Sequence, residues 1–398
     1  MSLHIIFVAP FGLKHKATVW ARTLPLAQAL VAAGHSATIL VPPWDSPEDA
    51  GQVKILGGVT IQQLSLAGGL MGTVRRLVHA IDQASPDIVH IVKPRAHAGL
   101  VQWWLWQRRR LGQTSKSAPK LVLDVDDWEQ AWTPVNRYNW FVGQFLAWQE
   151  EWGIRHADGI TAASRWLETK VATVAPHISR LYLPNGVNPL TIPATTPPAA
   201  PLHPADPSHP PQVLFFTRFI EVSPAWLAEF WTSLHKQMPT LELIIGGTPV
   251  QPWLATPFYV ALQGMPQVKW LGYVQPEDLP ALYANSTCAI FPAEAVPLMQ
   301  AKCSVKLATT LLHGLPTVAS DVGEQANYGA SGAARLVPAS ATPVEFAQAV
   351  TETIANPAQH ALLRTRGTQR LVTRYAWPHL TRDLIAFYRA LLDQSLEQ

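Results

Sequence analysis

The sequence predicts an α/β protein made of two doubly wound domains, each with a mostly parallel sheet. The first observation is a βαβ pattern, in which apolar runs at 3–9 and 37–41 flank a segment with helical spacing at 20–33. The second is a new series of short apolar runs that begins at 213. The third is the length of 398 residues, which is typical of two domains. Because ligands bind at the carboxyl ends of parallel strands, we expect a central cleft that the two domains face.

Composition limits the classes of function open to the chain. The net charge is only +3, so we expect no nucleic-acid partner. The two cysteines, Cys288 and Cys303, lack a CxxC or Cys/His metal spacing, which favours a reducing compartment and no structural zinc. The first residues lack the basic segment with which a signal peptide begins and are interpreted as a buried strand. No apolar run is long enough to span a membrane. We therefore expect a cytoplasmic protein, with peripheral association at the inner membrane face left open.

The first domain continues with alternating apolar and amphipathic segments. A strand is expected at 59–61, a helix at 74–81 and a buried strand at 87–92. His90 lies inside the last of these, where an imidazole is more often a hydrogen-bonded core residue than a base. Lys93 begins the loop after this strand and is a candidate for the cleft.

A segment at 100–111 combines aromatic rings with a run of arginines: Trp103, Trp104 and Trp106, then Arg108, Arg109 and Arg110. Such rings suit the headgroup level of a membrane, and guanidinium groups suit its anionic phosphates. A helix with inward tryptophans and solvated arginines explains the pattern equally well. A membrane surface is therefore one of two open interpretations.

Clustered carboxylates follow the apolar strand expected at 121–123: Asp124, Asp126, Asp127 and Glu129. Like charges this close should raise the pKa of at least one carboxyl group, which suits acid–base catalysis. We take Asp126 and Asp127 as the catalytic candidates. A capping cluster for the next helix stays open, whereas no second acidic cluster supports a metal site. The tryptophan-rich stretch to 152 predicts an acceptor-facing wall or an aromatic core.

A proline-rich segment divides the two halves of the chain. Residues 189–211 cannot continue a helix or a central strand and predict an interdomain linker. The domains are then 1–188 and 212–376, followed by a last helix within 377–398. In the second domain we expect strands at 213–218, 241–247, 268–274 and 288–292, and amphipathic helices at 343–354 and 381–396.

Two lysines precede a predicted helix that ends at Gly314. Lys302 and Lys306 lie four residues apart, and a short strand then runs into an Asp-Val-Gly turn that ends at Gly323. A helix N-terminus with flanking ammonium groups favours a phosphate. The alternative is a surface helix with two solvated lysines.

The order of these motifs resembles the retaining glycosyltransferases of family 4, which have the two-domain GT-B fold. The run 314–323 is similar to that family's G-x-P-V-V-A-S-D-V-G strand and turn, and 183–188 to its P-N-G-V turn. Residues 157–164 and 268–283 are also similar, so the resemblance covers nearly the whole chain. It implies a nucleotide-diphosphate sugar as donor substrate and a glycan or lipid-linked hydroxyl as acceptor. It also implies no cofactor and no metal requirement.

The resemblance assigns roles to residues of this chain. Arg218 and Lys306 are expected to neutralise the leaving diphosphate, with assistance from Lys302. Asp126 or Asp127 is expected to orient or deprotonate the acceptor hydroxyl. The last helix is expected to return to the first domain. The other donor-binding candidates are Gly12, Lys16, Thr309 and Glu324.

Three positions depart from the family pattern. Val92 stands where the family has a histidine and Thr309 where it has a glutamate, and no lysine follows Arg218 at the usual spacing. These departures keep a second hypothesis open, a GT-B protein that has lost catalysis and acts as a carbohydrate- or lipid-binding module. A GT-B sugar-nucleotide epimerase is a third hypothesis, which requires further acid–base groups in the cleft.

Overall fold

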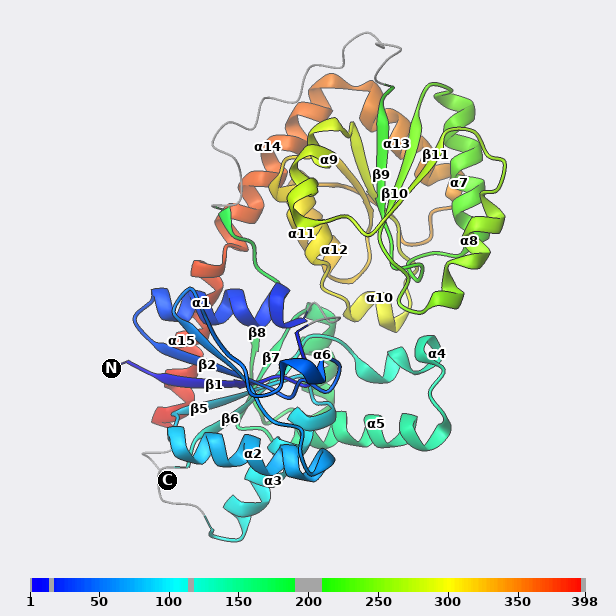
Figure 1. Ribbon diagram of the computed structural model, residues 1–398. Helices are drawn as coiled ribbons and strands as arrows, with labels where there is room; N and C mark the ends of the chain where they lie inside the picture. Colours follow the sequence, from blue (N-terminus) through cyan, green and yellow to red (C-terminus); the bar gives the residue numbers. More distant parts are fainter. Residues whose placement is uncertain (1, 14–17, 114–117, 190–209, 395–398) are drawn as a thin grey trace. The chain divides into compact units, whose positions relative to one another are not determined.

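The computed structural model describes residues 2–13, 18–113, 118–189 and 210–394 (Figure 1). They form two compact units, one of Met1–Gly186, Ala301–Cys303 and Trp377–Gln398, the other of Val187–Gln300 and Ser304–Ala376. Each unit has its own mostly parallel sheet with flanking helices. The predicted α/β class with two Rossmann-like domains is therefore confirmed. Most of the predicted linker lies outside the described residues.

The first unit contains an eight-stranded sheet with the order β3-β4-β2-β1-β5-β6-β7-β8. Neighbouring strands are parallel, except that β3 and β4 form an antiparallel hairpin at one edge. The strands are β1 (His4–Val8), β2 (Ser36–Val41), β3 (Val53–Leu56), β4 (Val59–Gln63), β5 (Ile88–Val92), β6 (Lys120–Val125), β7 (Gly159–Ala162) and β8 (Ser179–Tyr182).

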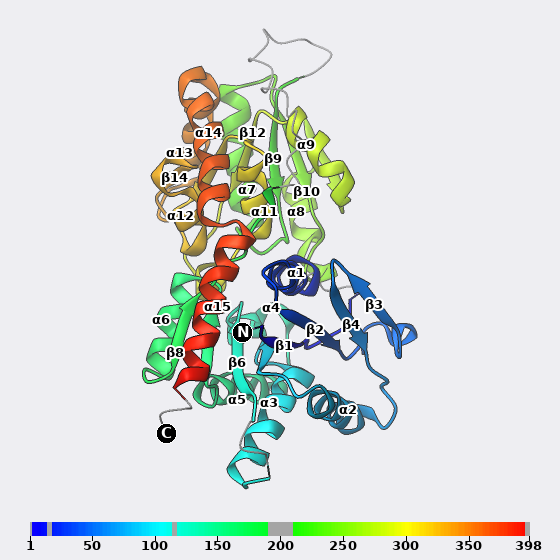
Figure 2. The same ribbon diagram turned by 90° about the vertical axis from the view of Figure 1, so that its left-hand side faces the viewer.

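Helices cover both faces of this sheet. On one face α1 and α15 pack together, and on the other α2, α3 and α5 lie side by side (Figures 1 and 2). A π-helical segment, Val19–Thr23, runs directly into α1. The helices are α1 (Leu24–Ala32), α2 (Gly69–Ala84), α3 (Ala96–Arg110), α4 (Thr133–Asn136), α5 (Trp140–Arg155), α6 (Arg165–Val174) and α15 (Trp377–Asp393).

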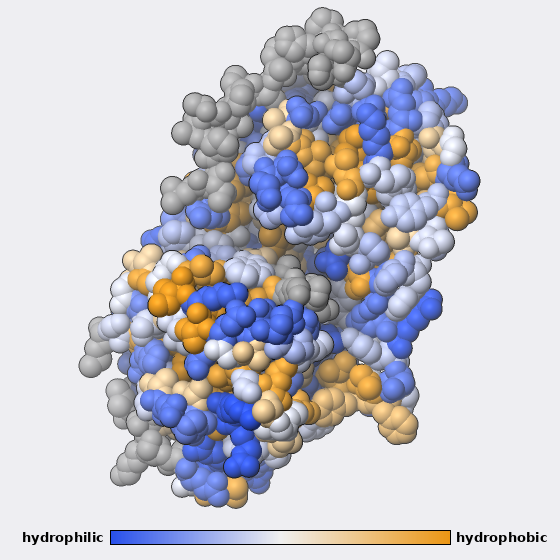
Figure 3. All heavy atoms as spheres, in the orientation of Figure 1, coloured by the Kyte–Doolittle hydropathy of each residue, from blue (hydrophilic) through white to orange (hydrophobic). Residues whose placement is uncertain are grey.

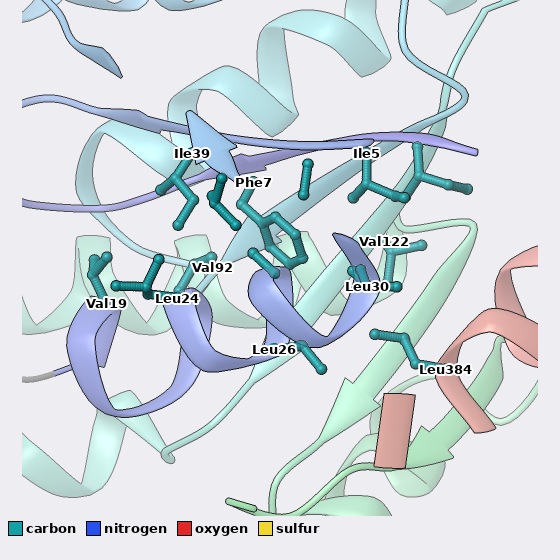
Figure 4. Close-up of a cluster of buried hydrophobic side chains, with 14 of the residues drawn as sticks. Ile5, Phe7, Val19, Leu24, Leu26, Leu30, Ile39, Val92, Val122 and Leu384 are labelled. Carbon is teal, nitrogen blue, oxygen red and sulfur yellow. The ribbon is translucent and has the colours of Figure 1, made fainter. Parts of the chain in front are cut away.

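The core between the sheet and α1 explains why the predicted βαβ pattern folds as it does. Leu26 and Leu30 of α1 are buried against strand residues such as Phe7, because helical spacing puts them on one face (Figure 4). Leu384 of α15 belongs to the same core. Packing of this kind holds the strands in register, so their carboxyl ends meet at one edge of the sheet.

The second unit contains a six-stranded, fully parallel sheet with the order β11-β10-β9-β12-β13-β14. Its strands are β9 (Gln212–Phe216), β10 (Glu242–Gly246), β11 (Val268–Gly272), β12 (Cys288–Phe291), β13 (Thr317–Ser320) and β14 (Arg335–Val337). Its helices are α7 (Pro224–Gln237), α8 (Thr256–Ala261), α9 (Leu279–Asn285), α10 (Pro297–Ala301), α11 (Val305–Leu312), α12 (Gly323–Gly329), α13 (Pro343–Ala355) and α14 (Pro357–Arg374). No helix within the described ranges is long and apolar enough to cross a membrane.

Candidate active site

A cluster of three carboxylates surrounds one lysine at the carboxyl ends of β5 and β6. Lys93 Nζ lies 2.8 Å from Asp126 Oδ1, 3.1 Å from Asp127 Oδ2 and 3.2 Å from Glu129 Oε1. Because β5 and β6 are parallel neighbours, the residues that follow them meet at the same edge. Lys93 adopts a left-handed backbone, with φ of 66°, a conformation that non-glycine residues seldom adopt outside functional sites and turns. Lys93, a candidate for the cleft from its place after the strand, thus lies at the centre of the predicted carboxylate cluster.

The three carboxylate groups lie close enough together to ligate a cation. Their nearest oxygens are within 4.8 Å of one another. In this structure the ammonium group of Lys93 contacts all three carboxylates and supplies the positive charge. The group is therefore an ion-pair network in which one lysine contacts three carboxylates.

Asp126, one of the two predicted catalytic carboxylates, has a strongly raised pKa. Burial raises its pKa to about 7, and the charges of Asp127 and Asp124 act in the same direction, whereas Lys93 lowers it. Burial by itself would lower the pKa of Lys93, but the three carboxylates raise it well above its usual value. Lys93 therefore stays charged, while Asp126 exchanges a proton near neutral pH. A carboxyl group with such a pKa can act as a general base or acid.

A second layer of contacts fixes the loop that carries Glu129. Arg95 donates to Glu129 Oε2 at 2.7 Å and to the hydroxyl group of Tyr138. From α5, Glu150 accepts the backbone N–H groups of Glu129, at 2.7 Å, and Gln130, at 3.2 Å. Burial and the charge of Glu129 raise the pKa of Glu150 to about 8. These contacts tie the carboxylate cluster to α3 and α5.

Asp124 has a different partner from the other carboxylates. Arg22, buried in the π-helical segment, donates from Nε to Asp124 Oδ2 at 2.7 Å and from Nη2 to Oδ1 at 2.6 Å. Thr161 donates to the same Oδ1 at 2.6 Å. Arg22 also contacts Asn185 Oδ1 at 3.2 Å and the carbonyl of Leu183 at 2.9 Å. Sequence reasoning missed Arg22, because no local pattern marks a partner so distant along the chain.

His90 is a core residue, as its position in an apolar strand favoured. Its Nδ1 lies 2.5 Å from the hydroxyl of Tyr388 in α15, and its Nε2 lies 3.4 Å from Thr161 Oγ1. Burial lowers its pKa to about 4, so the imidazole is neutral at physiological pH. The ring stacks on Phe7 with 5.0 Å between centroids. These contacts attach α15 to the sheet of the first unit.

Arg218 lies directly after β9, on a loop held by a buried carboxylate. Glu221 accepts the backbone N–H of Arg218 at 3.0 Å and the hydroxyl of Thr217 at 2.9 Å. The side chain of Arg218 itself is exposed. The region where the family pattern has a lysine is Glu221-Val222-Ser223-Pro224 in this chain, and Glu221 shapes the turn. The exposed guanidinium group is available to an anionic ligand.

Lys306 and Thr309 lie on α11, whose first turn is capped by Ser304. Lys306 Nζ lies 4.9 Å from the ring of Phe216 at the end of β9, a cation–π contact. Thr309 Oγ1 donates within the helix, to the carbonyls of Val305 and Lys306 at 3.1 Å, and lies 3.3 Å from the Tyr283 hydroxyl. Lys306 and Arg218 are therefore both placed around the end of β9.

The remaining candidates occupy different places. Gly12 is buried, and its N–H donates to Asp45 Oδ1 at 2.6 Å. Glu324 is buried in the first turn of α12 and accepts from Asn327 at 3.1 Å. Lys302 lies in the segment 301–303, which groups with the first unit. Lys16 lies outside the described residues.

Comparisons with known proteins agree with this architecture. A family model described as glycosyl transferase 4-like domain matches residues 17–186, and one described as glycosyl transferases group 1 matches residues 210–356. No curated protein sequence matches the chain.

Solved structures of glycosyltransferases are similar over almost the whole chain. Sucrose-phosphate synthase from Thermosynechococcus elongatus has a TM-score of 0.72 at 17% identity, covering 98% of this chain and 99% of that one. HepE from Anabaena, in complex with UDP and glucose, has a TM-score of 0.70 at 14% identity, covering 98% and 100%. A glycosyltransferase from Rickettsia africae has a TM-score of 0.67 at 12% identity, covering 98% and 99%.

The two Rossmann-like units, together with these matches, define a GT-B glycosyltransferase. The 4-like model and the group 1 model together cover most of the chain, which belongs to the group 1 glycosyl transferases. It is accordingly a nucleotide-sugar-dependent glycosyltransferase, as the motif order predicted.

Proposed function

We propose that this protein transfers a sugar, with retention of configuration, from a nucleotide-diphosphate sugar to a hydroxyl group of a glycan or lipid-linked acceptor. The observation that carries the proposal is the contact of Lys93 with Asp126, a carboxyl group whose pKa is about 7 at the carboxyl end of a parallel strand. Such a group can take a proton from an attacking hydroxyl near neutral pH.

The acceptor is assigned to the first unit. The ionised form of Asp126 would accept the hydroxyl proton as the new glycosidic bond forms. Asp127 is the more exposed of the pair, with 20% of its side chain accessible against 10% for Asp126, and would orient the same hydroxyl by hydrogen bonding. The charge of Lys93 would stay in place throughout, since the pKa of this lysine is raised well above its usual value.

The donor is assigned to the second unit. Breaking the bond between the sugar and the diphosphate leaves negative charge on the phosphate oxygens, which requires cationic donors. Arg218 offers an exposed guanidinium group that can bind two phosphate oxygens at once. Lys306, at the same strand end, offers a second positive charge. HepE from Anabaena was solved with UDP-glucose, which supports a nucleotide sugar as the donor class.

The proposal assigns no role to a metal ion or a cofactor. The carboxylates of Asp126, Asp127 and Glu129 contact the Lys93 ammonium group. Retention of configuration is proposed from the resemblance to family 4. An NMR experiment tests it directly: the anomeric coupling of the first product should match that of the donor sugar, and an inverted product would contradict retention.

Thermal shift with a panel of UDP-, GDP-, ADP- and TDP-sugars tests donor binding. One nucleotide class should raise Tm, because a ligand that binds only the folded state stabilises it by mass action. Arg218→Ala and Lys306→Ala should abolish that shift. Lys236→Ala, at an exposed site on α7, is the matched control and should keep it. A folded protein that no nucleotide sugar stabilises would contradict the assigned donor site.

A further inference from the structure

The outer surface of α2, α3 and α5 forms one continuous face of the first unit. The three helices pack in that order in the layer below the sheet (Figures 1 and 2). A groove of about 840 Å³ runs between α2 and α3, and its lining includes Arg75, Arg76, His79, Trp103, Trp104 and Arg108. We call this the basic groove.

The basic groove has an excess of positive charge. Its described lining contains three arginines and one histidine but a single acidic residue, Asp82. Asp82 is paired with Arg108 at 2.7 Å, while Arg76 donates to the backbone carbonyls of Ser65 and Ala67, just before α2. Arg75 and His79 are exposed. The groove is therefore suited to an anionic ligand, and its tryptophans add apolar surface beneath the charges.

The first half of α5 exposes an aromatic stripe. Trp140, Phe141, Phe145 and Trp148 are 68%, 77%, 45% and 47% exposed. Phe141, Phe145 and Trp148 recur at the spacing of one helical face, and Phe145 and Trp148 lie 5.8 Å apart between ring centroids. No charged residue occurs between Trp140 and Trp148. Figure 3 shows hydrophobic atoms gathered over this helix. Contiguous exposed rings of this kind mark an interaction surface.

Ring contacts connect the aromatic stripe to the arginine run of α3. Trp148 lies 6.2 Å from Trp152, whose ring meets the edge of Trp106 at 5.5 Å. The guanidinium group of Arg110 lies over Trp106, 5.4 Å from its centroid. The stripe and the arginines are thus parts of one surface, and the tryptophans at its centre are packed against one another.

We propose that this face, the basic groove together with the aromatic stripe, docks on an anionic membrane surface. Exposed tryptophan and phenylalanine rings suit the headgroup level, and guanidinium groups pair with lipid phosphates. Charge complementarity selects this occupant. A second copy of the same face would bring like charges together, and a neutral glycan would leave the basic side chains of the groove without counter-ions.

The docking surface is attached to the acceptor site. The helix that carries the aromatic stripe also carries Glu150, which accepts the backbone N–H of Glu129 in the carboxylate cluster at 2.7 Å. A membrane bound to the outer side of α5 would therefore lie on the unit that we assign to the acceptor, which favours a lipid-linked acceptor. This last step rests on the proposed function, whereas membrane binding itself does not.

Vesicle flotation of the full chain tests the proposal. Vesicles of phosphatidylcholine alone are compared with vesicles that also contain phosphatidylglycerol, at low and high salt. The chain should float with the anionic vesicles, and Arg75→Glu with His79→Glu should weaken binding roughly tenfold or more by reversing exposed charge. Trp140→Ser with Phe141→Ser should weaken the part of the binding that survives high salt. Lys236→Glu and Leu362→Ser, exposed in the second unit, are matched controls and should bind as the native chain does.

Three results would overturn membrane docking. The chain could fail to float with either vesicle type, it could float equally with both, or the aromatic variant could convert an oligomer to a monomer in light scattering. Thermal shift by the donor sugar, measured without vesicles, is the independent readout. A native donor response in the docking variants shows that they are folded and separates failure of docking from failure of the proposed transfer reaction.

Discussion

Lys93 and Asp126 form an ion pair, with 2.8 Å between Nζ and Oδ1, that joins the residues after two neighbouring strands. The lysine also contacts Asp127 and Glu129, so one ammonium group faces three carboxylates. Removal of the lysine would leave buried carboxylates without a counter-ion, which costs more than the ion pairs contribute. The stability and the acidity of this site therefore depend on the same residue.

Lys93→Met should destabilise the protein, and the loss should grow with pH. At pH 8 we expect a loss of about 3 kcal/mol, since removing one partner of a buried pair costs on this order. At pH 6 the loss should be smaller, because carboxyl groups without a counter-ion take up protons. Urea unfolding at the two pH values measures the difference. The same stability at both would contradict the central role of the lysine.

The Lys93→Met variant should also gain affinity for a divalent cation. The three carboxylate oxygens lie within 4.8 Å of one another and would then lack the ammonium group. Mn²⁺ or Ca²⁺ should raise the Tm of the variant but leave the native protein unchanged. Lys236→Met, at an exposed site, is the control and should behave like the native chain.

The rate of sugar transfer should rise with pH around 7. Burial raises the pKa of Asp126 to about 7, and the general-base role requires its ionised form. Asp126→Asn should lower kcat/KM by about 10² to 10⁴ and abolish this rise. Asp127→Asn, whose effect is assigned to orientation, should lower the rate but keep the pH profile. If Asp127→Asn abolished the rise of the rate with pH and Asp126→Asn kept it, the two roles would have to be exchanged.

Unfolding provides a control for Asp126 that does not depend on activity. Folding raises the pKa of Asp126 from its ordinary value of about 4 to about 7. Between these two pH values the carboxyl group is largely protonated in the folded state and largely ionised in the unfolded chain. Stability from this group is greatest at acidic pH and is lost as pH rises toward 7. The change in Tm that Asp126→Asn causes should therefore be more favourable at pH 8 than at pH 5.

Local patterns were sufficient for most of the fold. The helical spacing of apolar residues predicted the helix α1 between the strands β1 and β2. Continuous apolar runs predicted the strands that precede the carboxylate cluster. The edge strand β3 was missed, because its residues are mostly exposed and show no alternation. Gly57 and Gly58, with φ of 56° and 79°, were the available signal, since two glycines with positive φ favour a hairpin turn.

The candidate site was predicted less completely than the fold. The apolar strand that precedes Asp126 and Asp127 indicated that both would lie at the ligand edge of a sheet, but not that Lys93 would lie among them. Such contacts are set by tertiary packing between elements that are distant in the sequence. Lys93 and Asp127 are separated by 34 residues, and Arg22 and Asp124 by 102. The class of enzyme was inferred from the resemblance to a family, because two doubly wound domains serve many functions.

Arg22→Met should destabilise the protein strongly. Burial by itself raises the pKa of Asp124, but the Arg22 guanidinium group more than offsets this and lowers it below its ordinary value. Loss of one partner should cost about 3–5 kcal/mol at pH 7, as for other buried pairs. Chemical denaturation measures this loss, and the double variant with Asp124→Leu should recover part of it.

The pH dependence checks the assignment of this pair. A carboxyl group whose pKa is lowered on folding stabilises the protein above its unfolded pKa of about 3.9, and that contribution disappears as pH falls through the folded value. The difference between the native protein and Arg22→Met should therefore shrink on acidification below about pH 4. A constant difference would assign the effect of Arg22 to packing alone.

Gly12→Ala should lower stability even without a donor sugar. A Cβ atom at this position would overlap Asp45 Oδ1, which accepts the Gly12 N–H, and would lie 2.7 Å from Ser46 Oγ. Relief requires a shift of the loop after β2, and overpacking of this kind costs about 1–3 kcal/mol. Thermal unfolding without ligand measures this cost, which comes from these contacts because the φ of Gly12 does not lie in the left-handed region. Because Gly12 was also a candidate for close approach to the donor, the donor-induced rise in Tm separates the two roles. A native rise in Gly12→Ala would mean that glycine is required for packing alone, and a diminished rise would assign it to donor binding as well.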